Sequence, residues 1–214
     1  MLSSLDTSSG GLKMAGRSLS QADLIACTEY VAKMLQSHCE YFLFFGSLLG
    51  YVRDGTPIDG DDDVDIYVAN NNAKVIRQIL SKHQFQILLD GKLEKKEFFI
   101  QSYKNYNGKH LKADFYFYDD EDPFYIIDNW NFHAAPQNPA RALKIPKPLI
   151  YPIQEAPYCN SKVYLPKYPE IICEFLYGAS WKKKMKKTVD YKTAVIGGKP
   201  ILLTGSGKKM RIIP

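Results

Sequence analysis

Six aspartates lie between Asp54 and Asp65, and their carboxylates are the side chains of this sequence best suited to metal chemistry. Two like unit charges about 4 Å apart repel by about 1 kcal/mol in water and about 4 kcal/mol at an effective dielectric constant of about 20. A protein that gathers carboxylates against a strand therefore places a cation there, or raises the pKa of some of them. Side chains alternate along a strand, so Asp63 and Asp65 should share one face while Val64 and Ile66 enter the core. Two such carboxylates form half of an oxygen-ligand site for Mg²⁺, with Mn²⁺ as the alternative ion.

Gly46 and Ser47 precede this region and follow the apolar run Tyr41–Phe45, which predicts a buried strand. Glycine allows a ligand to approach the backbone closely, and we expect Ser47 to cap a short helix over Leu48–Arg53. The free N–H groups at the start of that helix would face a phosphate. Arg53 is the nearest cation for such a phosphate, although a surface ion pair with a neighbouring aspartate accounts for it equally well. We therefore predict that Gly46, Ser47 and Arg53 bind substrate.

Asp114 is the third candidate carboxylate. It lies in the middle of an aromatic strand predicted over Leu111–Tyr118, where an acid is costly unless it is paired or liganded. From a neighbouring strand it would complete the metal site, or take the proton of an acceptor hydroxyl. The competing interpretation is a structural ion pair with Lys112 or Lys109, as is common on exposed strand faces.

The aspartates thus divide into expected ligands and expected loop charges. The three strand carboxylates are predicted to be catalytic and to bind the metal, with Asp61 as an additional substrate-binding group. We expect the other three to be solvated: Asp54, Asp59 and Asp62. A purely solvated acidic turn does not explain two acids inside an apolar strand. An EF-hand is excluded because Ile66 and Asn72 occupy the positions of its required glycine and glutamate.

The pattern of apolar residues predicts an α/β fold in one domain. Helices are expected from Ser20 to about His38, over Lys74–Lys82 and over Glu170–Gly178. Strands are expected over Tyr41–Phe45, Asp63–Ala69, Phe85–Leu89, Phe98–Tyr103, Leu111–Tyr118 and in the segment Val163–Pro169. Three of these strands should form a meander with turns at Asp90-Gly91 and Asn105–Gly108. The catalytic domain is expected over residues 20–187, between a flexible leader, residues 1–19, and a C-terminal tail, residues 188–214.

Composition and missing motifs narrow the functional classes. The formal net charge of +5 favours anionic partners without identifying them. The basic run Lys182–Lys187 is interpreted as a solvated face, and nucleic-acid binding is not expected. Neither a P-loop nor a G-x-S-x-G elbow is present. No apolar run reaches the roughly 20 residues of a membrane span, and no signal peptide or C-x-x-C pair is seen. We expect a cytoplasmic protein with reduced cysteines, and peripheral association with a membrane is left open.

The stretch from Gly46 to Ile66 resembles the LicD/fukutin-type family, a branch of the nucleotidyltransferase superfamily with the DNA polymerase β-like fold. The family motif reads roughly G-[ST]-L-L-G-x-x-R followed by D-D-D-x-D-I. The corresponding residues are Gly46-Ser47-Leu48-Leu49-Gly50-Tyr51-Val52-Arg53 and Asp61-Asp62-Asp63-Val64-Asp65-Ile66. Weaker matches are Ala113-Asp114-Phe115, where the family carries an acidic strand, and Leu165–Trp181, where it carries a proline and Y-G-x-x-W. In place of the usual Pro-Trp pair before the aspartates, this sequence has Asp59-Gly60.

The resemblance implies a mixed β-sheet of nucleotidyltransferase type, with helices packed on it and a C-terminal helical or irregular part. It also implies a reaction in which phosphocholine or a polyol phosphate moves from a CDP-linked donor to a sugar or glycan hydroxyl. The residue spacing by itself reaches only metal-assisted phosphoryl or nucleotidyl transfer. Two alternatives stay open: a nucleotidyltransferase that modifies a small molecule, protein or RNA, and a non-catalytic binding module that keeps the fold.

Overall fold

The computed structural model describes residues 18–93, 96–129 and 144–184, and the backbone of short strands at 193–196, 199–202, 208–209 and 211–212. The expected leader, residues 1–19, lies outside the described residues except for Ser18 and Leu19. Met185–Lys187, the end of the basic run, and much of the expected tail also lie outside them. Within the described part of the chain, no helix is long and apolar enough to cross a membrane.

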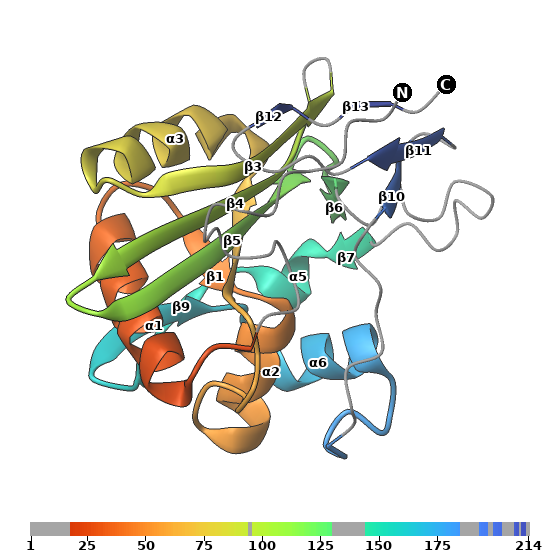
Figure 1. The fold of residues 1–214 in the computed structure, drawn as a ribbon. Coiled ribbons are helices and arrows are strands. Elements are labelled where there is room, and N and C mark those ends of the chain that lie inside the picture. The colour runs from red at the N-terminus through yellow and green to blue at the C-terminus, as the bar shows by residue number, and fades with distance from the viewer. Residues whose placement is uncertain are drawn as a thin grey trace.

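A mixed β-sheet forms the centre of the fold (Figure 1), in the strand order β1-β2-β5-β4-β3-β12, with β6 pairing with β5 and β7 with β6. β1 runs antiparallel to β2, and β2 runs parallel to β5. The predicted mixed α/β fold class is therefore confirmed. The strands are β1 (Tyr41–Leu43), β2 (Val64–Ala69), β3 (Gln86–Leu93), β4 (Lys96–Tyr106), β5 (Lys109–Asp119), β6 (Tyr125–Asp128), β7 (Lys144–Pro146) and β12 (Lys208–Lys209).

Helices α1 (Gln21–Leu35) and α3 (Ala73–Lys82) pack against the sheet, α1 on β5 and α3 on β3 (Figure 1). α1 begins as predicted, because the Ser20 side chain accepts a hydrogen bond from the Asp23 N–H at 3.1 Å. Its buried side chains recur every three or four residues and include Leu24, Cys27 and Val31. The apolar stripe thereby places α1 over the sheet.

The remaining elements, outside the main sheet and the helices on it, include α2 (Phe45–Asp54). Helix α6 (Pro169–Tyr177) packs on α2, and a separate hairpin is formed by β8 (Gln154–Tyr158) and β9 (Ser161–Leu165). α5 (Lys147–Ile150) follows β7. A 3₁₀ turn, η1 (Asn70–Asn72), links β2 to α3, and β10 (Thr193–Ile196), β11 (Lys199–Leu202) and β13 (Arg211–Ile212) form a small sheet.

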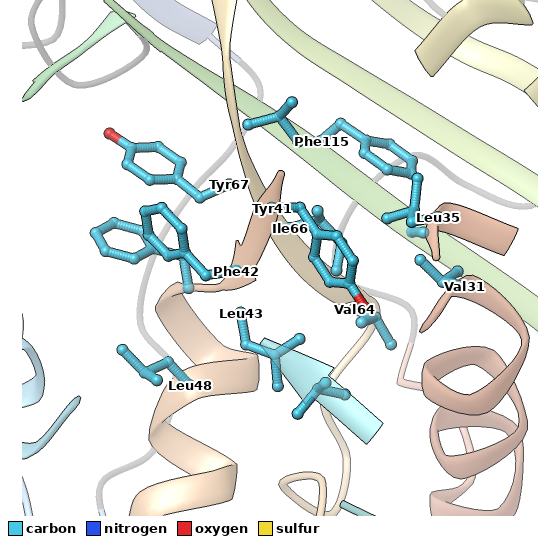
Figure 2. Packing of buried hydrophobic residues seen from close by; sticks show 14 of the residues in the cluster. Val31, Leu35, Tyr41, Phe42, Leu43, Leu48, Val64, Ile66, Tyr67 and Phe115 are labelled. Atoms are coloured by element: carbon cyan, nitrogen blue, oxygen red, sulfur yellow. The ribbon is translucent and has the colours of Figure 1, made fainter. Parts of the chain in front are cut away.

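The core lies around β1 and β2, both of which are buried on two faces. Val64–Val68 is buried along its whole length, including both the apolar and the acidic positions. Figure 2 shows Phe42 and Tyr67 side by side, and their ring centroids are 5.5 Å apart. Phe115 of β5 and Val31 of α1 belong to the same buried cluster. Asp65, the acid of β2, therefore lies on a buried and closely packed strand.

Several predicted boundaries were wrong for identifiable reasons. α2 begins at Phe45 rather than after Ser47, so the predicted strand ends at Leu43 and Ser47 is not the cap. Asp90-Gly91 lies inside β3 rather than in a turn, because both residues pair with β4 across irregular registers. The hairpin turn at Asn107 and Gly108 was predicted correctly. α5, β6, β7 and β8 were not anticipated, since these short elements lack a clear apolar period.

Candidate functional site

The parallel pairing of β2 with β5 brings the predicted carboxylates together. Asp65 lies directly opposite Asp114 in the strand register, so the two side chains share a face of the sheet. Asp63 immediately precedes β2 and reaches the same side, because its Oδ2 binds Lys112, which lies two positions before Asp114 on β5. All three are buried, with exposed fractions of 9% for Asp63, 5% for Asp65 and 3% for Asp114. The structure thus places these three acids on one side of the sheet, while their roles as metal ligands stay predictions.

Ser47 connects the start of α2 to the acidic strand. Its hydroxyl accepts a hydrogen bond from the Asp65 N–H at 2.8 Å, and its own N–H donates to Asp65 Oδ2 at 3.3 Å. The predicted helix cap was therefore wrong, because this hydroxyl binds the neighbouring strand instead of α2. The paired bonds orient the Asp65 carboxylate and hold the first turn of α2 beside β2.

Gly46 occupies the closest point between α2 and the aspartate loop. A Cβ atom at this position would lie 2.5 Å from Asp61 Oδ2 and 3.1 Å from Asp65 Oδ2. A side chain at this position would push both carboxylates away, so glycine lets them approach the helix as closely as they do. Asp61 and Asp65 therefore converge on the same point at the start of α2.

The sequence alone did not establish which carboxylates Lys112 contacts. Its ammonium donates hydrogen bonds to Asp62 Oδ2 at 3.1 Å and to Asp63 Oδ2 at 3.3 Å. Burial tends to lower the pKa of Lys112, but the charges of Asp114, Asp63 and Asp62 outweigh it and raise the pKa. Lys112 had been considered as an ion-pair partner of Asp114; it pairs with the two loop acids. The expectation that Asp62 is solvated was wrong, because its exposed fraction is only 3%.

Asp114 has one satisfied and one unsatisfied oxygen. Gln101 Nε2 donates to Asp114 Oδ2 at 3.0 Å. Oδ1 is buried and accepts no hydrogen bond among the residues that the structure describes. Burial, followed by the charge of Asp63, raises the pKa of Asp114 well above its usual range. An oxygen of this kind is suited to a metal ion or to a proton.

The donor set of the site fits a hard divalent cation. Carboxylate oxygens of Asp61, Asp62 and Asp63 lie within 4.8 Å of one another. Lys112 supplies one positive charge, whereas five carboxyl groups lie in or beside the site. These belong to Asp61, Asp62, Asp63, Asp65 and Asp114. Mg²⁺ and Mn²⁺ prefer oxygen ligands of this type. The close group is thus Asp61, Asp62 and Asp63, which shares only Asp63 with the predicted ligand set of Asp63, Asp65 and Asp114, so that set stays a prediction.

Arg53 does not join this group. Its guanidinium binds Asp54 through two hydrogen bonds, at 3.2 Å and 2.7 Å, and Lys184 approaches the same carboxylate at 3.4 Å. Arg53 lies in the last turn of α2, whereas Gly46 lies in the first, about 10 Å away along the axis. Of the two interpretations of Arg53, the structure shows the ion pair. It also shows that Asp54 is largely covered, with 15% of its side chain exposed, rather than solvated.

A small cavity opens between the acids and the hairpin β8–β9. Its lining includes Gly46, Ser47, Asp61, Asp63 and Tyr158. Tyr158, at the end of β8, is a residue that sequence reasoning missed. No local pattern singles out one tyrosine in a strand that carries no apolar alternation.

The comparison with known families agrees with this geometry. The family model described as LicD/FKTN/FKRP, nucleotidyltransferase domain, matches residues 38–168, more than half of the chain. The chain belongs to the LicD/FKTN/FKRP family. The matched segment of this LicD/FKTN/FKRP-family chain contains β1, α2, β2 and β5, and so every acid of the site. It ends at Tyr168, so the weaker similarity around Tyr177–Trp181 lies beyond it. Family membership supports the predicted transferase class.

Solved structures include a protein that is similar to this LicD/FKTN/FKRP-family chain. A structure described as the crystal structure of lincosamide antibiotic adenylyltransferase LnuA, lincomycin-bound, resembles it with a TM-score of 0.48 and 13% sequence identity. That similarity covers 79% of this chain and 91% of the other. The curated proteins include no match to this chain.

Proposed function

We propose that this protein is a Mg²⁺-dependent transferase that moves a phospho-substituent from a CDP-linked donor to a sugar or glycan hydroxyl. The observation that carries the proposal is the alignment of Asp65 with Asp114, next to Asp63 and to the start of α2. The resemblance to the LicD/fukutin-type family supports the CDP-linked donor and the hydroxyl acceptor, since characterised relatives use them. Mn²⁺ is the alternative ion.

The acidic side chains have separate roles in this proposal. Asp63, Asp65 and Asp114 hold the metal ion, and Asp61 lies beside it at the mouth of the site. When bound, the ion neutralises the negative charge of the donor diphosphate. Lys112 is not available to the donor, because Asp62 and Asp63 already bind its ammonium. The site has more carboxylates than ammonium groups, so the donor diphosphate is expected to bind only together with a cation.

The start of α2 supplies the contact with phosphate. Gly46 presents its backbone without a side chain, and the first N–H groups of a helix favour an anion. The Ser47 N–H is engaged by Asp65, so its role is to position that carboxylate. Of the two amides predicted to bind phosphate, that of Gly46 is therefore the stronger candidate. Arg53, engaged by Asp54, supports α2 from its other end.

The proposed reaction is a displacement at phosphorus. The acceptor hydroxyl oxygen attacks the phosphorus that carries the substituent, and a new P–O bond forms. The bond from that phosphorus to the oxygen bridging to the CMP phosphate breaks, and CMP leaves with the bond's electron pair. The acceptor proton passes to a carboxylate of the cluster. Substrate positioning by Gly46 and the acids is expected to provide much of the rate enhancement.

A thermal-shift screen with Mg²⁺ and CDP-choline, CDP-ethanolamine, CDP-glycerol or CDP-ribitol tests this proposal. A ligand that binds only the folded state at about 100 times its Kd stabilises it by about 2.7 kcal/mol. The variants Asp63→Asn and Asp65→Asn should lose the shift, while Asp59→Asn, which changes an exposed loop acid, should keep it. No metal-dependent shift with any donor, or equal shifts in all three variants, would contradict the proposal.

Transfer of a whole nucleotide is the second candidate function. Its support is that the matching family model is described as a nucleotidyltransferase domain. The same acids would serve, but a different phosphorus would be attacked. Product analysis separates the two reactions: a CDP-linked donor releases CMP in the first, whereas ATP or CTP releases pyrophosphate in the second. A chain that binds nucleotides with Mg²⁺ but releases neither product would be a binding module.

A further inference from the structure

A second pocket lies next to the acidic site, between α2, the hairpin β8–β9 and α6. It has a volume of about 330 Å³ and opens to solvent. Its walls are formed by Tyr51, Val52 and Gly55 of α2 and its end, by Pro157–Cys159 of the hairpin, and by Glu170 of α6. This volume is within the range of pockets that bind small molecules. None of the residues assigned so far to metal or phosphate lines it.

Tyr158 joins this pocket to the acidic site. It lines both this pocket and the small cavity beside Asp61 and Asp63. Its exposed fraction is 4%, and its hydroxyl has no hydrogen-bond partner among the described residues. Buried hydroxyl groups are normally satisfied, so an orphan at this boundary indicates a missing partner. Burial is also the main reason that the pKa of Tyr158 is raised, which keeps the hydroxyl protonated and able to donate.

The walls have a mixed apolar and polar character. The rings of Tyr51 and Tyr158 meet edge to face, with centroids 5.1 Å apart. Glu170 lies in the first turn of α6 and forms no ion pair within the described part of the chain, which leaves its carboxylate as an acceptor. This carboxylate disfavours an anion in the pocket. Aromatic rings beside an acceptor and an unused hydroxyl donor suit a neutral, polyhydroxylated molecule of about the pocket's size.

We propose that this pocket is the acceptor subsite and takes a sugar or polyol, with Glu170 accepting its hydroxyl groups and Tyr158 donating to the hydroxyl nearest the acids. The inference rests on the proposed transferase function, which it deepens. The reacting hydroxyl would enter the acidic site past Tyr158, while the rest of the acceptor stays between α2 and α6. Tyr158 then contacts the acceptor, and Glu170 determines the specificity for the acceptor.

Saturation-transfer NMR with the full chain tests the subsite directly. The probes are D-glucose, D-galactose, N-acetyl-D-glucosamine, glycerol and ribitol, with choline chloride as the cationic comparison. At least one sugar or polyol should receive saturation from the wild-type protein. Glu170→Gln should weaken its binding about tenfold or more, since hydrogen bonds to a charged group are among the stronger ones. Glu174→Gln, on the same helix but outside the pocket walls, is the matched control.

Tyr158→Phe removes only the orphan hydroxyl. Because that hydroxyl has no partner in the unliganded protein, the variant should unfold at the same temperature as wild type or higher, yet bind the sugar more weakly. Tyr168→Phe, an exposed tyrosine outside the pocket walls, should change neither property. A lower unfolding temperature with unchanged sugar binding would show that the hydroxyl serves the fold, and would overturn its assignment.

Donor binding separates failure of this inference from failure of the proposed function. With Mg²⁺ and the CDP-linked donors, Glu170→Gln and Tyr158→Phe should give the wild-type thermal shift, whereas Asp63→Asn should lose it. Sugar binding without any donor shift would keep the pocket as a sugar site and reject the transferase. A donor shift without sugar or polyol binding, binding of choline alone, or equal sugar affinity in Glu170→Gln and Glu174→Gln would overturn the subsite.

Discussion

Gly46→Ala perturbs the contact between α2 and the aspartates by a single methyl group. The new Cβ would lie 2.5 Å from Asp61 Oδ2, and ordinary contact begins at about 3.4 Å, so this carboxylate must retreat by about 0.9 Å. Asp65 Oδ2, at 3.1 Å, must move by a few tenths of an ångström. Both atoms are ends of side chains, so the backbone can stay in place. The change therefore disturbs the acids more than the fold.

The expected magnitudes differ for stability and for metal binding. Alanine in a helix is favoured over glycine by roughly 0.5–1 kcal/mol, which offsets part of the crowding at Gly46. The unfolding temperature without metal should therefore stay close to that of wild type. Displacing Asp61, beside the proposed ion, by about 1 Å and Asp65, a proposed ligand, by a few tenths of an ångström should weaken Mg²⁺ binding, and the reaction that depends on it, about 10- to 100-fold. Isothermal titration with Mg²⁺ and thermal unfolding of the metal-free protein measure the two effects separately.

Gly50→Ala is the matched control within the same helix. Its Cβ would lie 2.9 Å from the backbone oxygen of Thr56 and 3.1 Å from the backbone nitrogen of Ile58. Backbone atoms cannot retreat as a carboxylate can, so this variant should lose roughly 1–3 kcal/mol of unfolding free energy. The folded fraction should bind Mg²⁺ normally. Wild-type Mg²⁺ affinity in Gly46→Ala, together with an unchanged unfolding temperature, would refute the reasoning about the crowded acids.

Two buried charges give further predictions. Lys112→Met leaves Asp62 and Asp63 without their ammonium partner, so urea denaturation should show a loss of about 3–5 kcal/mol in the free energy of unfolding. Added Mg²⁺ should restore part of this loss. Equal stability of the variant and the wild type would argue against the pairing. Asp54→Asn removes the negative charge and one of the two oxygens that accept from Arg53, and should cost about 1–3 kcal/mol of unfolding free energy at pH 7. The Arg53 hydrogen bond lowers the pKa of Asp54 in the folded state, so this contribution exists above the ordinary value near 3.8 and disappears as the pH falls below it. Urea midpoints against pH should therefore converge on acidification, and a gap that is constant with pH would exclude the ion pair as its cause.

The local features of the site could be predicted because they depend on neighbouring residues. Alternation along one strand predicted that Asp63 and Asp65 share a face, and the aromatic strand around Asp114 marked a third buried acid. Gly46 was identified as a point of close approach, although the group approaching it in the structure is the pair Asp61 and Asp65. The helix start at Ser20 also followed from its own first turn.

Tertiary structure decided the pairings between distant segments. The sequence allowed Asp114 to face any partner, and only the parallel register of β5 with β2 placed it opposite Asp65. The same register brought Lys112 to Asp62, which looked like a loop charge when read alone. Strand order and register depend on burial over the whole sheet, which a local window does not contain.

The sequence by itself determined the local groups of this protein: carboxylates before and within one strand, a glycine in the adjacent segment and a recognisable family motif. The tertiary structure decided which groups meet. It turned Ser47 from a helix cap into a partner of Asp65, held Arg53 at the other end of α2, and carried Tyr158 to the boundary of the acidic site. The physical reason is that side-chain type and alternation are local, whereas contacts between elements follow from how the whole chain buries its apolar surface.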